Sequence, residues 1–297
     1  MLRNNIIKLY TVAHPLIHLI WESYICKKHP TMKLTYLLTI ILTITFISCK
    51  TDDPSSDDTQ QTPNEYFPLA ADSHWTYNNQ NEEAGTSRDS VYVAGNQMQS
   101  GLLYTNLDAT LPASAFMSQF LTNNIVRTTD TQLIIDGSLG APIEGLPDIT
   151  LPLSDMKLYD TEVDIAIDPI LGFSSGSVIQ DIMEIPIVIS YGITSAMLET
   201  PNTSTESDSQ VASELRVNME IIAMISVGPV TIPVTIMESQ DVLIATNIYT
   251  DGIGLTNSEV LIEFTLEDLS GLGIELPFPE SGSTGSSQTI DTYFIGG

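Results

Sequence analysis

Apolar and polar side chains alternate along several stretches of this chain, most clearly from Glu214 to Val227. Leu, Val, Met and Ile take the odd positions of this run, and charged or polar residues take the even positions of its first half. After Gly228-Pro229 the alternation resumes on even positions as far as Ile236. A period of two is typical of half-buried strands, so two such runs around a tight turn predict a β-hairpin. Because proline has no N–H to donate, Pro233 should lie at a sheet edge or at a bulge.

Similar alternation predicts further strands at 162–168, 183–191 and 259–266. Shorter strands are expected in five places: Ser90–Ala94, Leu102–Asn106, Gln132–Asp136, Val242–Tyr249 and Thr289–Ile295. The Pro- and Gly-rich stretches Gly140–Pro152 and Gly271–Gly285 are expected to be long connections. Many short strands with turns between them indicate an all-β fold, mainly antiparallel, built as an open or half β-barrel or a sandwich.

One or two short helices are also expected. After Leu111-Pro112, the residues Phe116, Met117, Phe120 and Leu121 fall on one helical face, and the segment ends near Asn123-Asn124. Core packing is the common use of such a face, and a lipid-binding groove is the alternative.

The stretch Met32–Asp53 predicts export. Lys33 precedes the uncharged segment Leu34–Ile47, which suits a secretory signal and is shorter than the roughly 20 residues of a membrane-spanning helix. Phe46-Ile47-Ser48-Cys49 resembles the lipobox of bacterial lipoproteins. That resemblance implies a signal peptide over 32–49 and a diacylglycerol lipid on Cys49, which would become the first residue of the mature protein.

Lys50, Asp52 and Asp53 follow at once and resemble the export signal of Bacteroidota-type lipoproteins. The resemblance implies a lipid-anchored protein of the outer membrane, exposed at the cell surface, with the periplasmic face as the alternative. An ordinary polar spacer is the other interpretation of these residues. Residues 50–65 are acidic and contain two prolines, so they predict a flexible tether.

Residues 1–31 are expected to be a non-native extension upstream of a start at Met32, or else a leader removed with the signal. Residues 66–297 are then expected to form a single β-rich domain.

Two motifs at opposite ends of this domain resemble uncharacterised exported proteins of the same bacterial group. The first is Tyr66-Phe67-Pro68-Leu69 followed by Trp75-Thr76-Tyr77, and the second is Tyr249–Leu255 with its Gly-x-Gly. The resemblance implies an antiparallel half-barrel similar to lipoprotein-carrier folds, and it implies no activity. Trp75 and Tyr77 alternate on one strand face, where they are expected to fill the core.

Charge excludes one class of partner. Residues 1–49 contain five of the 10 Lys and Arg residues and one of the 37 Asp and Glu residues, so residues 50–297 hold 36 acids, 5 bases and a net charge of −31. Such a field repels phosphate backbones, so no nucleic-acid partner is expected. It also disfavours anionic headgroups, which leaves the lipid as the predicted membrane contact.

Cysteine and histidine are scarce in the predicted mature chain, which retains only Cys49 and His74. A disulfide framework and a His/Cys zinc cluster are therefore excluded, and a Ser-His-Asp triad would have to use His74. No metal or catalytic residue is assigned. Ca²⁺ is a possible ligand of acidic loops such as Asp251-Gly252, although the sequence has no Asp-x-Asp-x-Asp-Gly run.

Other candidate sites are less specific. Asp164 with Asp168, and Glu259 with Glu263, have the spacing of carboxylates on one strand face, as a hydrolase could use. Asp89-Ser90-Val91 resembles an O-glycosylation acceptor, which would place the glycan on Ser90. The alternative is a Ser exposed at a strand start.

These features favour a lipid-anchored surface lipoprotein that is not an enzyme and whose domain binds an apolar ligand or a partner protein. A surface adhesin or glycan-binding module is the alternative. A carboxylate-based hydrolase that uses His74 is the third hypothesis.

Overall fold

The computed structural model describes residues 66–143, 146, 149–182, 185–200, 209–269 and 279–297. The chain divides into two compact units, Met1–Asp58 and Thr59–Gly297, and every described residue belongs to the second. The predicted extension, signal peptide and tether lie outside the described residues, as do the four predicted anchor and export residues Cys49, Lys50, Asp52 and Asp53.

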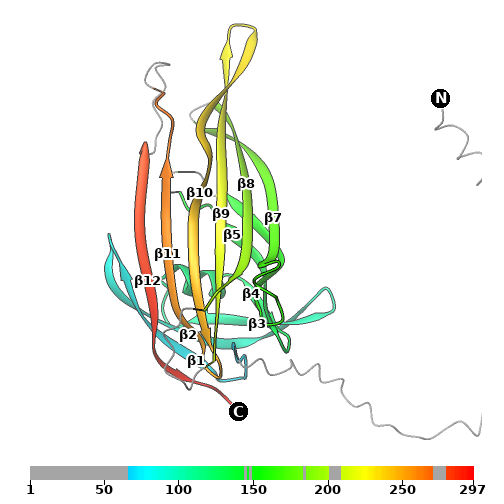
Figure 1. Ribbon diagram of the computed structural model, residues 1–297. Helices are drawn as coiled ribbons and strands as arrows, with labels where there is room; N and C mark the ends of the chain where they lie inside the picture. The colour runs from blue at the N-terminus through cyan, green and yellow to red at the C-terminus, as the bar shows by residue number, and fades with distance from the viewer. Residues whose placement is uncertain (1–65, 144–145, 147–148, 183–184, 201–208, 270–278) are drawn as a thin grey trace, which may run out of the picture. The chain divides into compact units, whose positions relative to one another are not determined.

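The described residues form one antiparallel sheet of twelve strands in the order β6-β5-β4-β3-β2-β1-β12-β11-β10-β9-β8-β7 (Figure 1). The strands of the first half are β1 (His74–Asn81), β2 (Gly85–Gln99), β3 (Leu102–Ala109), β4 (Ile125–Thr128), β5 (Gln132–Gly140) and β6 (Thr150–Asp160). Those of the second half are β7 (Ile170–Ile182), β8 (Ile185–Leu198), β9 (Gln210–Val227), β10 (Val230–Thr250), β11 (Gly254–Thr265) and β12 (Ser281–Phe294).

The sheet curls into a nearly closed barrel. Strands consecutive in the chain pair with each other, except β6 and β7, and β1 pairs with β12 to join the two halves. The sheet edges, β6 and β7, are consecutive in the chain and lie against each other, where the Ser174 hydroxyl donates to the Pro152 carbonyl oxygen at 3.1 Å. The predicted all-β, antiparallel, open-barrel fold is confirmed.

The predicted hairpin is confirmed as β9 and β10. Val227 pairs with Val230 across Gly228-Pro229, and Gly228 has a φ of 64°, a left-handed conformation that favours glycine. Described pairing of β10 with β11 begins only at Leu243, so Pro233 lies where β10 is paired on one side. The edge prediction for Pro233 is therefore also confirmed.

The two alternating runs at 230–236 and 242–249 belong to one long strand. Three register shifts interrupt β10 between Thr235 and Leu243, where Ile236 and Met237 are both buried, and beyond them the odd positions Leu243, Ala245 and Tyr249 face inward. Bulges of this kind explain why one strand looked like two in the sequence.

The strand predicted at 162–168 is wrong. This segment is the connection between β6 and β7, in which the Asp164 carbonyl accepts from the N–H groups of Ile167 and Asp168, both at 3.0 Å. The Asp164 carboxylate also accepts from the Ala166 N–H at 3.1 Å, and Ile167 is 81% exposed. The alternating residues therefore form a turn, because an Asp that accepts local backbone N–H groups competes with a sheet ladder.

The two predicted long connections are shorter than expected. Strand β6 begins at Thr150, inside the first, and β12 begins at Ser281, inside the second. The Gly and Ser residues that begin β12 have low strand propensity, and pairing with β1 and β11 overrides it.

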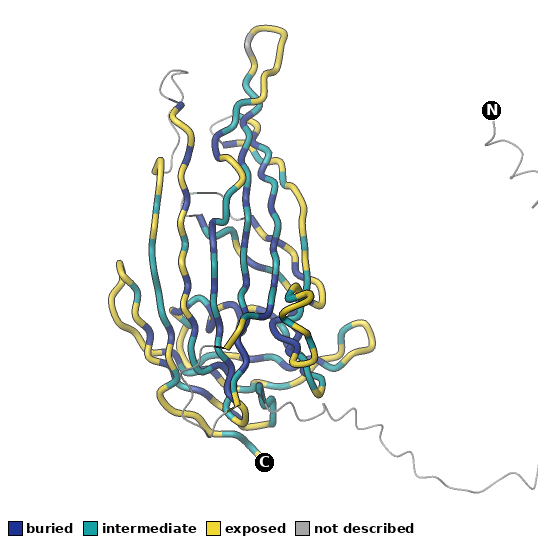
Figure 2. Tube along the Cα trace, viewed as in Figure 1, coloured by how far each residue is buried: buried dark blue, intermediate teal, exposed yellow. Residues whose placement is uncertain are grey.

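The helix among the described residues is α4 (Phe116–Thr122), as predicted. Met117, Phe120 and Leu121 are buried in the barrel core, as core packing predicts, and Phe116 is partly buried against it. Ala115 gives the helix no side-chain cap, and the buried Asp89 carboxylate of β2 supplies acceptors instead, for the N–H groups of Ser114 and Ala115, each at 2.9 Å. Figure 2 shows buried positions alternating with less buried ones along the strands around this core.

An aromatic cluster closes one end of the core and joins the two sequence motifs. Phe67 stacks on Trp75 with ring centroids 5.3 Å apart, and the Trp75 Nε1–H donates to the Ile253 carbonyl oxygen at 2.5 Å. Tyr249 lies 6.2 Å from the Phe67 ring, and burial raises the pKa of the Tyr249 phenol above its ordinary value. Trp75 and Tyr77 are both buried, so their predicted core role is confirmed.

Candidate functional site

An interior pocket of about 310 Å³ lies between α4, the end of β5, and strands β10 and β11. Its apolar wall combines Phe116 and Phe120 of α4, whose rings stack 5.8 Å apart, with Leu243 of β10 and Ile262 of β11. Leu243 and Ile262 face each other across the β10–β11 ladder, so strand register places both on the inner surface of the barrel. The pocket is therefore built from segments more than 100 residues apart in the chain.

Asn124, a polar residue of this pocket, connects the helix and the strand that form its walls. The Asn124 side chain accepts from the Ser138 N–H at 2.6 Å and donates to the Phe120 carbonyl oxygen at 2.8 Å, so it ties the end of α4 to β5. Gly137 has a φ of 141°, and a Cβ there would lie 2.0 Å from the Asn124 Oδ1. Glycine is thus required at 137 for Asn124 to make these bonds.

A row of buried polar side chains crosses the inner face of the sheet. Strand register places five residues side by side on consecutive strands, in the order Asn79, Gln288, Ser258, Asn247 and Ser213. All are buried, and Gln288 donates to the hydroxyl of Ser118 on α4 at 2.8 Å. Four of the row's oxygens have no protein partner among the described residues: Asn79 Oδ1, Gln288 Oε1, Ser258 Oγ and Asn247 Oδ1. Such groups are rare in folded proteins, so this row is an unusually polar layer in an otherwise apolar core.

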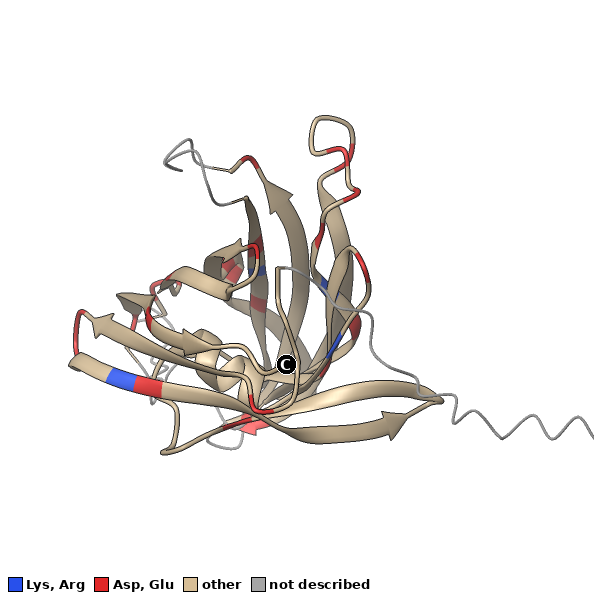
Figure 3. Cartoon of the chain, turned by 90° about the horizontal axis from the view of Figure 1, so that it is seen from below, with Lys and Arg blue, Asp and Glu red and all other residues tan. Residues whose placement is uncertain are grey.

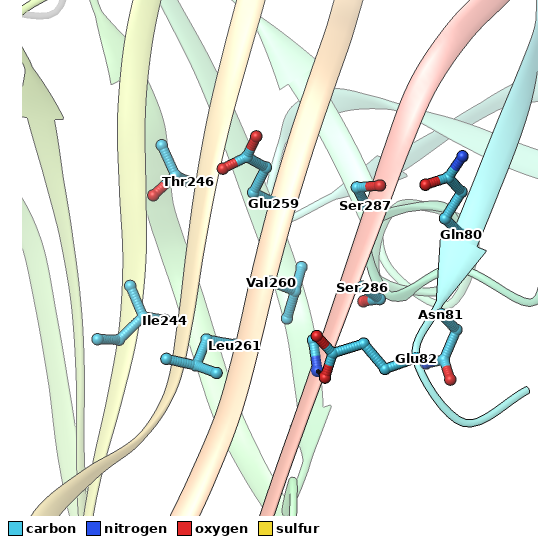
Figure 4. A pocket seen from close by; sticks show the side chains of 11 residues that line it. Gln80, Asn81, Glu82, Ile244, Thr246, Glu259, Val260, Leu261, Ser286 and Ser287 are labelled. Carbon is cyan, nitrogen blue, oxygen red and sulfur yellow. Dashed lines mark hydrogen bonds between the residues drawn. The ribbon is translucent and has the colours of Figure 1, made fainter. Parts of the chain in front are cut away.

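A second cavity, the outer groove, has a volume of about 530 Å³ and lies on the outer face of β1, β12, β11 and β10 (Figure 4). Two rows of side chains line it, as fixed by strand register. The polar row consists of Thr246, Glu259, Ser287 and Gln80, and the second row consists of Ile244, Leu261, Gly285 and Glu82. The groove therefore has an apolar shelf on β10 and β11 and a carboxylate on each side of β12.

Charge around the outer groove is one-sided. The four basic residues of the described part of the chain all have acidic partners: Arg88 with Asp291, Arg127 with Asp155, Lys157 with Asp160, and Arg216 with Glu214 and Asp241. None of these residues lines the groove. Figure 3 shows the same imbalance, with acidic positions spread over the strands and few basic ones.

The candidate sites predicted from sequence do not gather into one centre. His74 is exposed and stacks on Phe294 at 5.5 Å, and Asp251 is exposed in the turn between β10 and β11. Glu259 and Glu263 do share the outer face of β11, whereas Asp164 and Asp168 share no strand face. Within the described ranges, no group of three or more His, Cys, Asp or Glu residues could hold a metal ion.

Ser90, the predicted glycosylation site, is half-buried within β2 and pairs with Thr76 of β1. Its neighbour Asp89 is buried against Ser114 and Ala115. Asp89 therefore has a structural role in positioning α4, and glycosylation of Ser90 stays a prediction.

Sequence reasoning missed the interior pocket, the polar row and the outer groove as sites. The signal for the row was present, because Asn79, Asn247 and Ser258 stand at strand positions where the alternation calls for apolar residues. The groove left no signal before the strand order was known, since its walls come from β1 and β11.

Comparisons of the chain with protein-family models, with curated proteins and with solved structures found no match. In the described part of the chain, no helix has the length and apolar content to cross a bilayer.

Proposed function

We propose that the protein is a lipoprotein of the outer membrane, anchored by a lipid on Cys49 and exposed at the cell surface, that binds a ligand and is not an enzyme. The lipobox-like Phe46–Cys49 and the Lys50, Asp52 and Asp53 that follow support the anchor and its destination. Acyl chains contribute about 0.8 kcal/mol per buried CH₂, so two or three chains hold a protein durably on a membrane.

The ligand of the domain, on this proposal, is a small apolar molecule held in the interior pocket. The observation that carries it is the wall of Phe116, Phe120, Leu243 and Ile262, which combines aromatic and aliphatic side chains around about 310 Å³. The polar lining residues are neutral amides and hydroxyls, so the pocket favours an uncharged ligand portion. The described lining residues include no acid or base, which also supports binding in preference to acid–base catalysis.

A variant that fills the pocket tests this function. In the compact unit Thr59–Gly297, which contains the whole described core, Ile262→Trp places an indole in the space of the ligand. We expect a fluorescent acyl probe to bind the wild type and to bind this variant at least about tenfold more weakly, a change of about 1.4 kcal/mol.

Ile179→Trp is the matched control, because Ile179 lies 73% exposed on β7, away from the pocket. It should bind the probe as the wild type does. Equal affinity of all three proteins, with unchanged melting temperatures, would remove the interior pocket as the binding site.

A further inference from the structure

The outer groove has small residues at its base and larger side chains along two sides. On β12, the residues that face outward into the groove are Gly285 and Ser287, while Leu261 and Glu259 of β11 stand on one side. On the other side, the Glu82 N–H donates to the Gly285 carbonyl oxygen and the Glu82 carboxylate accepts from the Gly285 N–H, both at 3.0 Å. Figure 4 shows the Glu82 side chain reaching back toward β12, so hydrogen bonds to the sheet hold this wall of the groove in position.

The turn that carries Glu82 is also fixed. The Asn81 side-chain oxygen accepts from the N–H groups of Glu83 and Ala84 at 2.9 and 2.8 Å. Gly85 closes the turn with a φ of 79°. These hydrogen bonds fix the Glu82 side of the groove before any ligand binds, and a preformed site lowers the entropic cost of binding.

The charges that line the groove favour a cationic binding partner. Glu82 and Glu259 line it, and the four basic residues between 66 and 297 are all engaged elsewhere, with carboxylates outside the groove. The strongly negative domain adds a long-range field that attracts basic partners and speeds their association.

The shape of the groove favours a peptide. Its lining rows run across four strands, and Ile244 and Leu261 form an apolar shelf beside the carboxylates. Lys and Arg side chains have apolar stems that cover such shelves and charged ends that reach carboxylates. A saccharide site would usually offer an aromatic platform, and none of the described residues that line this groove is aromatic.

We propose that the outer groove docks an extended, Lys- or Arg-rich segment of a partner protein. Glu82 and Glu259 receive its cationic ends, and Ile244 and Leu261 cover its apolar stems. This interaction is separate from ligand binding in the interior pocket, and either can fail without the other.

The test uses the full chain in a non-ionic detergent and a labelled peptide of alternating Lys and Ala, roughly eight residues long, which would extend over about 26 Å. We expect fluorescence anisotropy to show binding that weakens as salt rises from roughly 50 to 300 mM. The pair Glu82→Gln with Glu259→Gln should weaken binding by about fivefold or more. The pair Asp181→Asn with Glu238→Gln removes the same charge from exposed positions elsewhere and should weaken it by less than about twofold.

A substitution that fills the groove without changing its charge distinguishes docking in the groove from non-specific electrostatic attraction to the acidic domain. Ser287→Tyr fills the floor of the groove and should lower affinity by about fivefold, whereas Ser177→Tyr, on the exposed face of β7, should not. Equal effects of the two charge pairs, or wild-type affinity of Ser287→Tyr, would overturn the proposal in favour of non-specific attraction. Salt-insensitive binding of a neutral oligosaccharide that Ser287→Tyr abolishes, without peptide binding, would overturn it in favour of a glycan site.

Discussion

Asp160 at the end of β6 is a buried carboxylate held in its charged form. Burial alone would raise its pKa, but three donors outweigh burial and lower that pKa below its ordinary value. Lys157 lies 2.9 Å from the Asp160 Oδ2, the Gln132 amide lies 2.7 Å from the same oxygen, and the Glu162 N–H lies 3.2 Å from Oδ1. These bonds join β6 to β5 and to the connection between the two halves of the barrel.

Asp160→Asn should therefore change the acid stability of the protein. Because the pKa of the folded state is lower than the unfolded value of about 3.9, the contribution of Asp160 is complete above that value and is lost as pH falls below it. We expect the variant to be about 1–3 kcal/mol less stable than the wild type at pH 7. Between about pH 5 and 2, the unfolding free energy of the variant should fall by less than that of the wild type. Urea unfolding across this range measures both effects.

The control for this prediction is Asp181→Asn, which alters an exposed carboxylate of β7. It should follow the wild-type pH dependence throughout. An Asp160→Asn curve parallel to that of the wild type would contradict the assigned role of Asp160.

For single residues, burial could be predicted from the sequence, whereas alignment across paired strands could not. Trp75 and Tyr77 were predicted to be core residues from alternation alone, and both are buried. The alignment of Asn79 with Gln288 depends on the pairing of β1 with β12, which are the first and the last strand in the chain. No local pattern contains that information.

At the scale of elements, the best predictions are those with a long, strict period or a strong turn. The hairpin of β9 and β10 meets this condition and is confirmed, and the short helix α4 is confirmed on the strength of its apolar face after Leu111-Pro112. The strand predicted at 162–168 failed because an Asp-based turn can imitate a short alternation.

Strands β6 and β7 were the hardest to predict, because they carry irregularities. The pairing of β6 with β5 shifts register twice, and Asp155 in β6 has a φ of 46°. Strand β7 contains two glycines and three serines, which have low strand propensity. These two strands are the edges of the sheet, where irregular backbone is expected because it limits further strand pairing.

At the scale of the whole molecule, the predicted anchor and the acidic domain have separate roles. The lipid would place the domain on a membrane, while the domain's charge would keep its surface away from anionic headgroups and nucleic acid. The barrel class could be predicted from sequence, whereas both cavities depend on the closure of the sheet through β1 and β12.

Cys49→Ser tests the anchor within the full chain. A hydroxyl cannot carry the thioether-linked lipid, so we expect the variant to move from the membrane fraction to the soluble fraction and to lose incorporation of labelled fatty acid. Cys26→Ser, which alters the cysteine upstream of the predicted signal, should behave as the wild type does. Membrane attachment of Cys49→Ser equal to that of the wild type would contradict lipidation at this position.

Photolabelling of the unit Thr59–Gly297 with a diazirine-bearing fatty alcohol tests whether the interior pocket binds an apolar ligand. Peptide mass spectrometry should place the label on α4, Phe116–Thr122, and on the facing positions Leu243 and Ile262, and excess unlabelled alcohol should remove it. Label confined to exposed residues outside the pocket, or label that unlabelled alcohol does not displace, would contradict binding in the pocket.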